Sequence, residues 1–155
     1  FIQVSPSGNI SNGKLFLDLP GKLRIDYKKP SNLLITCQGF FVIIQNRKLK
    51  TTNNIPLSQT PFSILLNDNI NFKNKNLLLD LKNSLGIITL RIKIAKRPKI
   101  GELVLEFSEK PFILRKWIIK DIVGDKTTVL IQNVKYNQNL SFKIFFPDDM
   151  PEQEN

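Results

Sequence analysis

Residues 17–30 read LDLPGKLRIDYKKP and decide the fold class, because they hold two alternating runs of apolar and polar residues joined at Pro20-Gly21. Successive side chains of a β-strand point to opposite faces, so this period of two is typical of strands. Proline fixes φ and glycine accepts a positive φ, which suits a tight turn between the runs. The stretch therefore predicts a hairpin of strands at residues 13–19 and 22–27.

The same alternation, rich in Ile, Val, Phe and Thr, recurs along the rest of the chain. Most of the runs are separated by about two to six residues, which favours antiparallel hairpins over helical crossovers. The chain is therefore expected to form a long antiparallel sheet. The further predicted strands are residues 2–5, 32–37, 40–45, 48–52, 77–82, 87–95, 102–107, 113–121, 127–135 and 140–146.

One segment, SQTPFSILLND at residues 58–68, breaks the alternation. Thr60 is a favoured N-cap residue, and Pro61 suits the first position of a helix. Three apolar residues then recur at helical spacing, which is the pattern of an amphipathic helix. We predict a short helix at residues 61–67. Its apolar residues are Phe62, Leu65 and Leu66.

The 155 residues suit one domain, because a chain of this length buries about 70% of its unfolded surface without disulfides or metals. The polar residues 67–76 predict a loop with a brief strand at 70–72. The end of the chain, PDDMPEQEN, is acidic and contains two prolines, as disordered tails do. We expect a single domain at residues 1–147 and an acidic disordered tail at 148–155.

The chain is strongly basic, with 23 Lys and Arg against 13 Asp and Glu and a net charge of +10. Three explanations are open: AT-rich codon usage, which also favours Ile and Asn; weak attraction to anionic lipid headgroups; and nucleic-acid binding. The lysines are scattered along the whole chain, and only the RKWIIKD segment at residues 115–121 interleaves basic and aromatic residues. The scatter favours codon usage, and we expect no nucleic-acid partner.

Catalytic groups are scarce. The chain has no His and one cysteine, Cys37, so common nucleophilic triads and an internal disulfide are excluded, and a cysteine zinc site is not expected. The carboxylates lie singly at turns or on polar strand faces, where solvated side chains are the usual outcome. We therefore expect that the protein is not an enzyme and binds no metal ion and no cofactor. No apolar run reaches the roughly 18 residues of a membrane span.

The apolar side chains of the opening hairpin are its most informative feature. Leu15, Leu17 and Leu19 point one way, and Leu23, Ile25 and Tyr27 do the same on the next strand. One short helix is too small to cover the apolar face of so long a sheet. Three outcomes would satisfy that face: closure into a barrel, docking of a further helix or a partner, or an apolar ligand.

Three stretches together resemble the LolA-type outer-membrane lipoprotein carrier proteins, especially their alphaproteobacterial branch. They are GKLFLDLPGKLRIDYKKP at residues 13–30, QGFFVIIQNRKLKTTNNIPLSQTPFSILL at 38–66 and LRKWIIKDIVGDKTTVLIQNVKYNQNLSFKIFFPDD at 114–149. The likeness covers nearly the whole chain. Its specificity comes from the order and spacing of the Pro-Gly hairpin, the segment that opens a helix and the late hairpin.

The resemblance implies a mainly β fold of the LolA/LppX kind: a curved antiparallel sheet that forms an incomplete, unclosed barrel of about 11 strands, with short helices as a lid. It also implies a chaperone that shelters the acyl chains of lipoproteins in an apolar cavity and carries them from the inner to the outer membrane. The residues carried over as cavity lining are Leu15, Leu17, Leu19, Leu23, Ile25, Tyr27, Phe62, Leu65 and Leu66.

The partners implied are acylated lipoproteins, an inner-membrane lipoprotein-releasing transporter, and an outer-membrane acceptor or the membrane itself. The implied location is the periplasm, and we expect a monomer. The chain begins at Phe1 rather than Met, and the family's first helix before the strand that Phe1-Ile2-Gln3 resembles is absent. We therefore expect that a signal peptide and that helix precede the residues given.

Leu19 departs from the family's pattern, which usually has Arg before the Pro-Gly turn. The polar latch that ties the sheet to the lid in typical members cannot form from a leucine. An alternative function is also open: a periplasmic sensor or assembly module of the same fold that binds another lipid or a protein segment.

Overall fold

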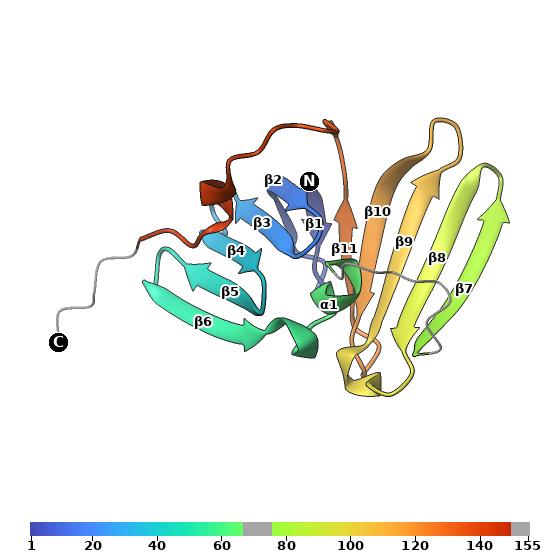
Figure 1. Ribbon diagram of the computed structural model, residues 1–155, viewed down its shortest axis with the longest axis horizontal. Helices are drawn as coiled ribbons and strands as arrows, with labels where there is room; N and C mark the ends of the chain where they lie inside the picture. The colour runs from blue at the N-terminus through green and yellow to red at the C-terminus, as the bar shows by residue number, and fades with distance from the viewer. Residues whose placement is uncertain (67–75, 150–155) are drawn as a thin grey trace. The chain divides into compact units, whose positions relative to one another are not determined.

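The computed structural model describes residues 1–66 and 76–149. Eleven strands follow the order β6-β5-β4-β3-β2-β1-β11-β10-β9-β8-β7, and the pairings described between neighbours are antiparallel. β6 and β7 end this order and are not paired with each other, so the sheet is not closed. The predictions of a mainly β chain and an unclosed sheet of about 11 strands with short helical pieces are confirmed (Figure 1).

The chain divides into two compact units, residues 11–68 with 135–155, and residues 1–10 with 69–134. We call them the first and the second unit. The first contains a meander in which each strand pairs with the next one along the chain. Its elements are β2 (Ile10–Asp18), β3 (Lys22–Tyr27), β4 (Leu33–Gln38), β5 (Phe41–Asn46), β6 (Thr51–Pro56), η1 (Leu57–Gln59), α1 (Phe62–Leu65) and η3 (Phe142–Phe145).

The second unit orders its strands β1-β11-β10-β9-β8-β7. Its core follows from alternation and register, since Leu90, Leu105, Trp117 and Val129 lie in one row across four strands and are all buried. Its elements are β1 (Ile2–Val4), β7 (Leu77–Ser84), β8 (Ile87–Ile94), η2 (Pro98–Ile100), β9 (Glu102–Ser108), β10 (Ile113–Lys120) and β11 (Lys126–Leu130).

Gly101 joins η2 to β9 and must be glycine for two reasons. Its φ is +88°, and a Cβ atom there would collide with the carbonyl oxygen of Lys120. The predicted turn at Pro20-Gly21 is confirmed, since it joins β2 to β3 with a positive φ at Gly21. Leu85-Gly86 likewise joins β7 to β8, with a positive φ at both residues.

The predicted strand at residues 140–146 is wrong. This segment forms the 3₁₀ turn η3, which lies against β3 and β4 instead of pairing in the sheet. Alternation would bury Phe142 and Phe146, but these are 52% and 45% exposed, whereas Phe145 is fully buried. The alternation of apolar and polar residues therefore does not reflect strand geometry in this segment. The segment is instead held in place by the buried side chain of Phe145.

Other boundaries also differ from the prediction. The strand predicted at residues 127–135 is β11, which ends at Leu130, because residues 131–135 are not in the sheet. The strand predicted at residues 48–52 is β6, which begins later at Thr51 because residues 47–50 form the turn after β5. The predicted helix is α1, but Thr60 does not cap it, since its hydroxyl donates to the Leu57 carbonyl at 2.9 Å. The brief strand predicted at residues 70–72 lies outside the described residues. Within the described ranges no helix is long and apolar enough to cross a bilayer.

Candidate functional site

The register of β2 to β6 builds one continuous apolar face. One row across the five strands is Leu17, Leu23, Cys37, Val42 and Ile55, and the next is Leu15, Ile25, Ile35, Ile44 and Asn53. Nine of these ten residues are apolar, and we call the nine, together with Tyr27, the apolar face. Tyr27 lies on the same side of β3 as Leu23 and Ile25.

The structure brings together five of the predicted residues on this face: Leu15, Leu17, Leu23, Ile25 and Tyr27. The three on β3 are buried, with exposed fractions of 7% or less, whereas the two leucines of β2 are half-buried. Leu19 is not part of the face, because β2 ends at Asp18 and the Leu19 side chain is 54% exposed in the turn.

Sequence reasoning missed the face residues on β4 to β6, namely Ile35, Cys37, Val42, Ile44 and Ile55. The run FFVIIQ is apolar at successive positions, so alternation alone does not say which side chains share a side with Leu23. The register between β4 and β5 supplies this information, and only the structure gives it.

Helix α1 is attached to one end of the same unit. The Gly21 amide donates to the Leu66 carbonyl at 3.0 Å, and the Leu57 amide donates to the Phe40 carbonyl at 2.8 Å. Both bonds tie the segment to turns at that end of the sheet. Of the three predicted helix residues, Leu65 and Leu66 are buried and Phe62 is half-buried.

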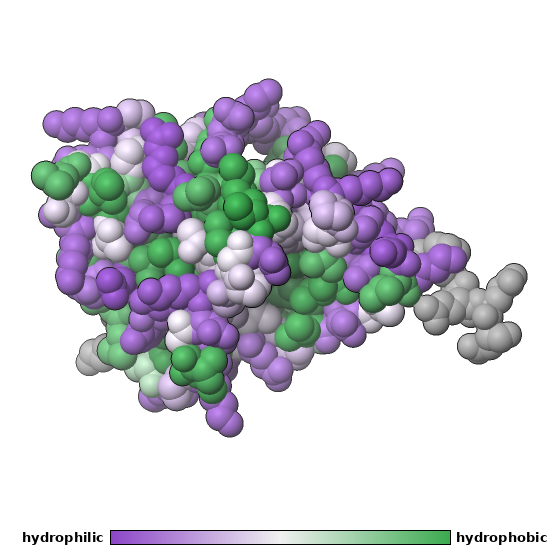
Figure 2. All heavy atoms as spheres, turned by 180° about the vertical axis from the view of Figure 1, so that it is seen from behind, coloured by the Kyte–Doolittle hydropathy of each residue, from purple (hydrophilic) through white to green (hydrophobic). Residues whose placement is uncertain are grey.

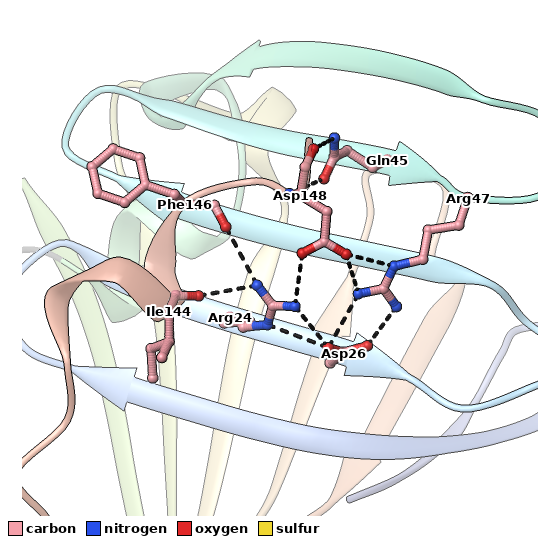
Figure 3. A network of polar contacts seen from close by, with 7 residues as sticks. All are labelled: Arg24, Asp26, Gln45, Arg47, Ile144, Phe146 and Asp148. Carbon is pink, nitrogen blue, oxygen red and sulfur yellow. Dashed lines mark hydrogen bonds and ion pairs between the residues drawn. The ribbon is translucent and has the colours of Figure 1, made fainter. Parts of the chain in front are cut away.

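The opposite face of β3 to β5 is covered by the end of the chain. Residues 141–149, which we call the C-terminal strap, run across it, with Phe145 fully buried. Four charged side chains form ion pairs at the strap: Arg24 and Asp26 from β3, Arg47 after β5, and Asp148 (Figure 3). The strap thus closes this face with the protein's own residues.

The polar side chains named above hold the strap through direct hydrogen bonds. Arg47 binds Asp26 at 2.7 Å and Asp148 at 2.6 Å, and Arg24 binds the same two carboxylates at 2.8 and 3.1 Å. Arg24 also donates to the carbonyls of residues 144 and 146. The buried Gln45 side chain both donates to the Asp148 carbonyl and accepts from its amide, at 2.9 and 2.8 Å. The two arginines and two carboxylates therefore satisfy one another.

A protein-family model described as outer membrane lipoprotein carrier protein LolA matches residues 1–148 of this chain. The chain belongs to the LolA family. The predicted resemblance is thereby confirmed over both units of the fold. The match ends at Asp148, so the family pattern takes in the strap as well as the apolar face.

Among curated proteins, this LolA-family chain is similar to an uncharacterized protein of Rickettsia prowazekii (strain Madrid E), with 27% identity over 132 residues. The aligned part covers 83% of the chain and 62% of the relative. The chain therefore spans less than two thirds of the length of the relative that it matches.

Two carboxylates of this LolA-family chain, Asp26 on the strap face and Glu102 in the second unit, have pKa values lowered by neighbouring cations. Hydrogen bonds from Arg47, and then from Arg24, hold the pKa of Asp26 below its ordinary value of 3.8, although burial opposes the shift. In the second unit burial raises the pKa of Glu102, but Lys93 at 3.1 Å and Lys120 at 3.4 Å outweigh it and leave the pKa lowered. Both carboxylates are therefore charged at neutral pH.

The apolar face carries no reactive group at neutral pH. Burial raises the pKa of the Cys37 thiol to about 11, so it stays protonated and is a poor nucleophile. Among the described residues, His, Cys, Asp and Glu side chains form no group of three that could hold a metal ion. What this face offers to a ligand is apolar surface.

Polar side chains on one face of the molecule are interspersed with apolar ones (Figure 2). Several of the basic residues are paired with carboxylates, as Lys22 is with Asp18 and Lys116 with Glu106. This arrangement agrees with the scatter of lysines along the sequence.

Proposed function

We propose that this chain is a periplasmic carrier that shelters the acyl chains of lipoproteins on its apolar face and shuttles them from the inner to the outer membrane. The observation that carries the proposal is the pair of register-matched rows on β2 to β6, in which nine of ten side chains are apolar. Membership of a family described as lipoprotein carriers supports it. The role is that of a chaperone and not of an enzyme.

Hydrophobic burial supplies the binding energy. Each methylene moved from water to the apolar face contributes about 0.8 kcal/mol, so an acyl chain needs no polar anchor to be held. The rows offer leucine, isoleucine and valine side chains without a fixed charge that would select one headgroup. The face thus fits a carrier of diverse lipoproteins, because it recognises the chains that all of them share.

Release requires the site to open, and α1 is the element proposed to move. Two backbone hydrogen bonds attach the segment from η1 to α1: Leu57 to Phe40 at its start and Gly21 to Leu66 at its end. Leu19, which stands where the family usually has Arg, adds no side-chain donor to this attachment. The lid is therefore proposed to open at a lower cost than one latched by a charged side chain.

The remaining parts of the role are proposed with it. The cavity is lined by Leu15, Leu17, Leu23, Ile25 and Tyr27, and closed by Phe62, Leu65 and Leu66 of the α1 segment. Loading by an inner-membrane lipoprotein-releasing transporter and unloading at an outer-membrane acceptor, or at the membrane itself, complete the cycle of a monomeric carrier.

Native mass spectrometry tests the proposal. The purified protein, incubated with a synthetic diacylated lipopeptide, is expected to retain one lipopeptide per chain, while the same peptide without acyl chains is not retained. Absence of any lipopeptide adduct, with the protein folded by circular dichroism, contradicts the carrier. Equal retention of the unacylated peptide favours the sensor or assembly module instead.

A further inference from the structure

We propose that an exposed apolar tip at one end of the first unit docks on the surface of a lipid bilayer. The tip consists of Leu19 in the β2–β3 turn and Phe40 and Phe41 at the β4–β5 turn. Their side chains are 54%, 85% and 51% exposed. Large apolar side chains at such exposure are common singly, but a group of them marks an interaction site.

The two turns form one structure. The Gly39 amide donates to the Gly21 carbonyl at 3.3 Å, which joins the β2–β3 turn to the β4–β5 turn at the tip. Because the turns are joined, Leu19 and Phe40 project from the same end of the sheet. The Phe40 carbonyl already accepts from the Leu57 amide at 2.8 Å, so the tip presents side chains more than free backbone groups.

Aromatic and basic residues continue the tip onto the strap face. Lys22 directly follows the β2–β3 turn, and its ammonium lies 5.8 Å from the centre of the Phe142 ring. Phe142 packs edge to face against Phe146 at 5.2 Å, and both rings are about half exposed. Exposed phenylalanine rings suit a bilayer interface, where they enter the headgroup region, whereas Lys22 is paired with Asp18.

A bilayer fits this surface better than a protein segment does. The three exposed side chains lie on or beside two reverse turns, and not along β6, the edge strand to which a partner strand would add. The net charge of +10 attracts the whole chain to an anionic membrane, and three apolar side chains at the tip then anchor it there.

The tip is connected by hydrogen bonds to the end of α1. Gly21 makes both connections, because its carbonyl accepts from Gly39 at the tip and its amide donates to Leu66 at the end of α1. Contact with a bilayer therefore brings the end of α1 to the membrane. The inference goes beyond the proposed function, and the vesicle experiment below uses cargo-free protein, so either can fail alone.

Vesicle binding of the whole protein tests the proposal. With vesicles of phosphatidylglycerol and phosphatidylcholine, Phe40→Asp is expected to lower the partition coefficient about tenfold or more. Leu85→Asp is the matched control, because Leu85 is 99% exposed in the β7–β8 turn of the second unit. It is expected to bind like the natural protein, and circular dichroism checks that both variants fold.

Phe40→Trp gives a second readout at the tip itself. Trp117, which is the natural tryptophan, is 1% exposed, so lipids with brominated chains are expected to quench the new residue and leave the buried one bright. Equal loss of binding in Phe40→Asp and Leu85→Asp overturns the proposal. So does binding that Phe40→Asp leaves unchanged and that about 0.5 M salt abolishes, because charge alone then explains it.

Discussion

Replacing Leu17 by glutamate is expected to lower the affinity for an acylated ligand at least about tenfold, because the change places a charge among the apolar side chains that hold the chain. Leu17 is half-buried and begins the row that continues through Leu23 and Cys37. Its side chain can therefore change without emptying a fully packed site. Displacement of a fluorescent fatty acid by a diacylated lipopeptide measures the effect.

Phe16→Glu is the matched control for this variant. Phe16 is the neighbour of Leu17 on β2 and is equally half-buried, but it points to the opposite face, where it lies across from Arg24. A glutamate there lies on the side away from the apolar rows and is expected to change lipid affinity less than about twofold. Equal losses in the two variants would contradict the assignment of the ligand to one face of the sheet.

Replacing Asp26 by alanine is expected to lower the free energy of unfolding by about 2–3 kcal/mol, because Arg24 and Arg47 lose the carboxylate between them. The estimate is below that for a fully buried pair since 28% of the Asp26 side chain remains exposed. Urea denaturation measures it. Asp18→Ala is the control, because Asp18 is 42% exposed and its ion pair among the described residues is with Lys22; its expected cost is below about 1 kcal/mol.

The same carboxylate makes the strap sensitive to acid. The pKa of Asp26 is lower in the folded protein than its ordinary 3.8, so its contribution is complete above that pH and is lost as the pH falls through the folded value. The stability difference between the natural protein and Asp26→Ala is therefore expected to stay constant from about pH 7 to 5 and to shrink below about pH 4. A difference that shrinks already at pH 6 would contradict the lowered pKa.

Strand positions could be predicted from the sequence because alternation and turn chemistry agree at most joints. The hairpin of β2 and β3 illustrates this, since its two apolar runs and Pro20-Gly21 each independently favour the same pairing. The same alternation predicts which residues of β2 and β3 belong to the apolar face. The residues that continue this face on β4 and β5 cannot be predicted in this way, because they depend on the register between the strands.

The strap could not be predicted for a different reason. Asp26, Arg47 and Asp148 are far apart in the sequence, and nothing in their local patterns distinguishes them from solvated surface charges. Asp148 begins the predicted disordered tail, yet it is held by both arginines and by Gln45. Residues 150–155, the rest of that tail, lie outside the described residues.

The two faces of the first unit therefore have different roles in this account. The face with Arg24 and Asp26 is closed by the chain's own strap, through charged groups and the buried ring of Phe145. The other face has uncharged apolar rows, and α1 is attached to one end of the same unit by backbone hydrogen bonds. The strap face is therefore closed by the chain itself, and the apolar face is the one proposed to hold acyl chains.

Photo-cross-linking with a lipopeptide whose acyl chain carries a diazirine tests the central claim most directly. Peptide mapping after irradiation is expected to place the cross-links on Leu15, Leu17 and the β4 and β5 residues of the same rows, and to find none on Phe16 or Arg24. Cross-links confined to the strap face, or the absence of any cross-link from a bound lipopeptide to those rows, would contradict it.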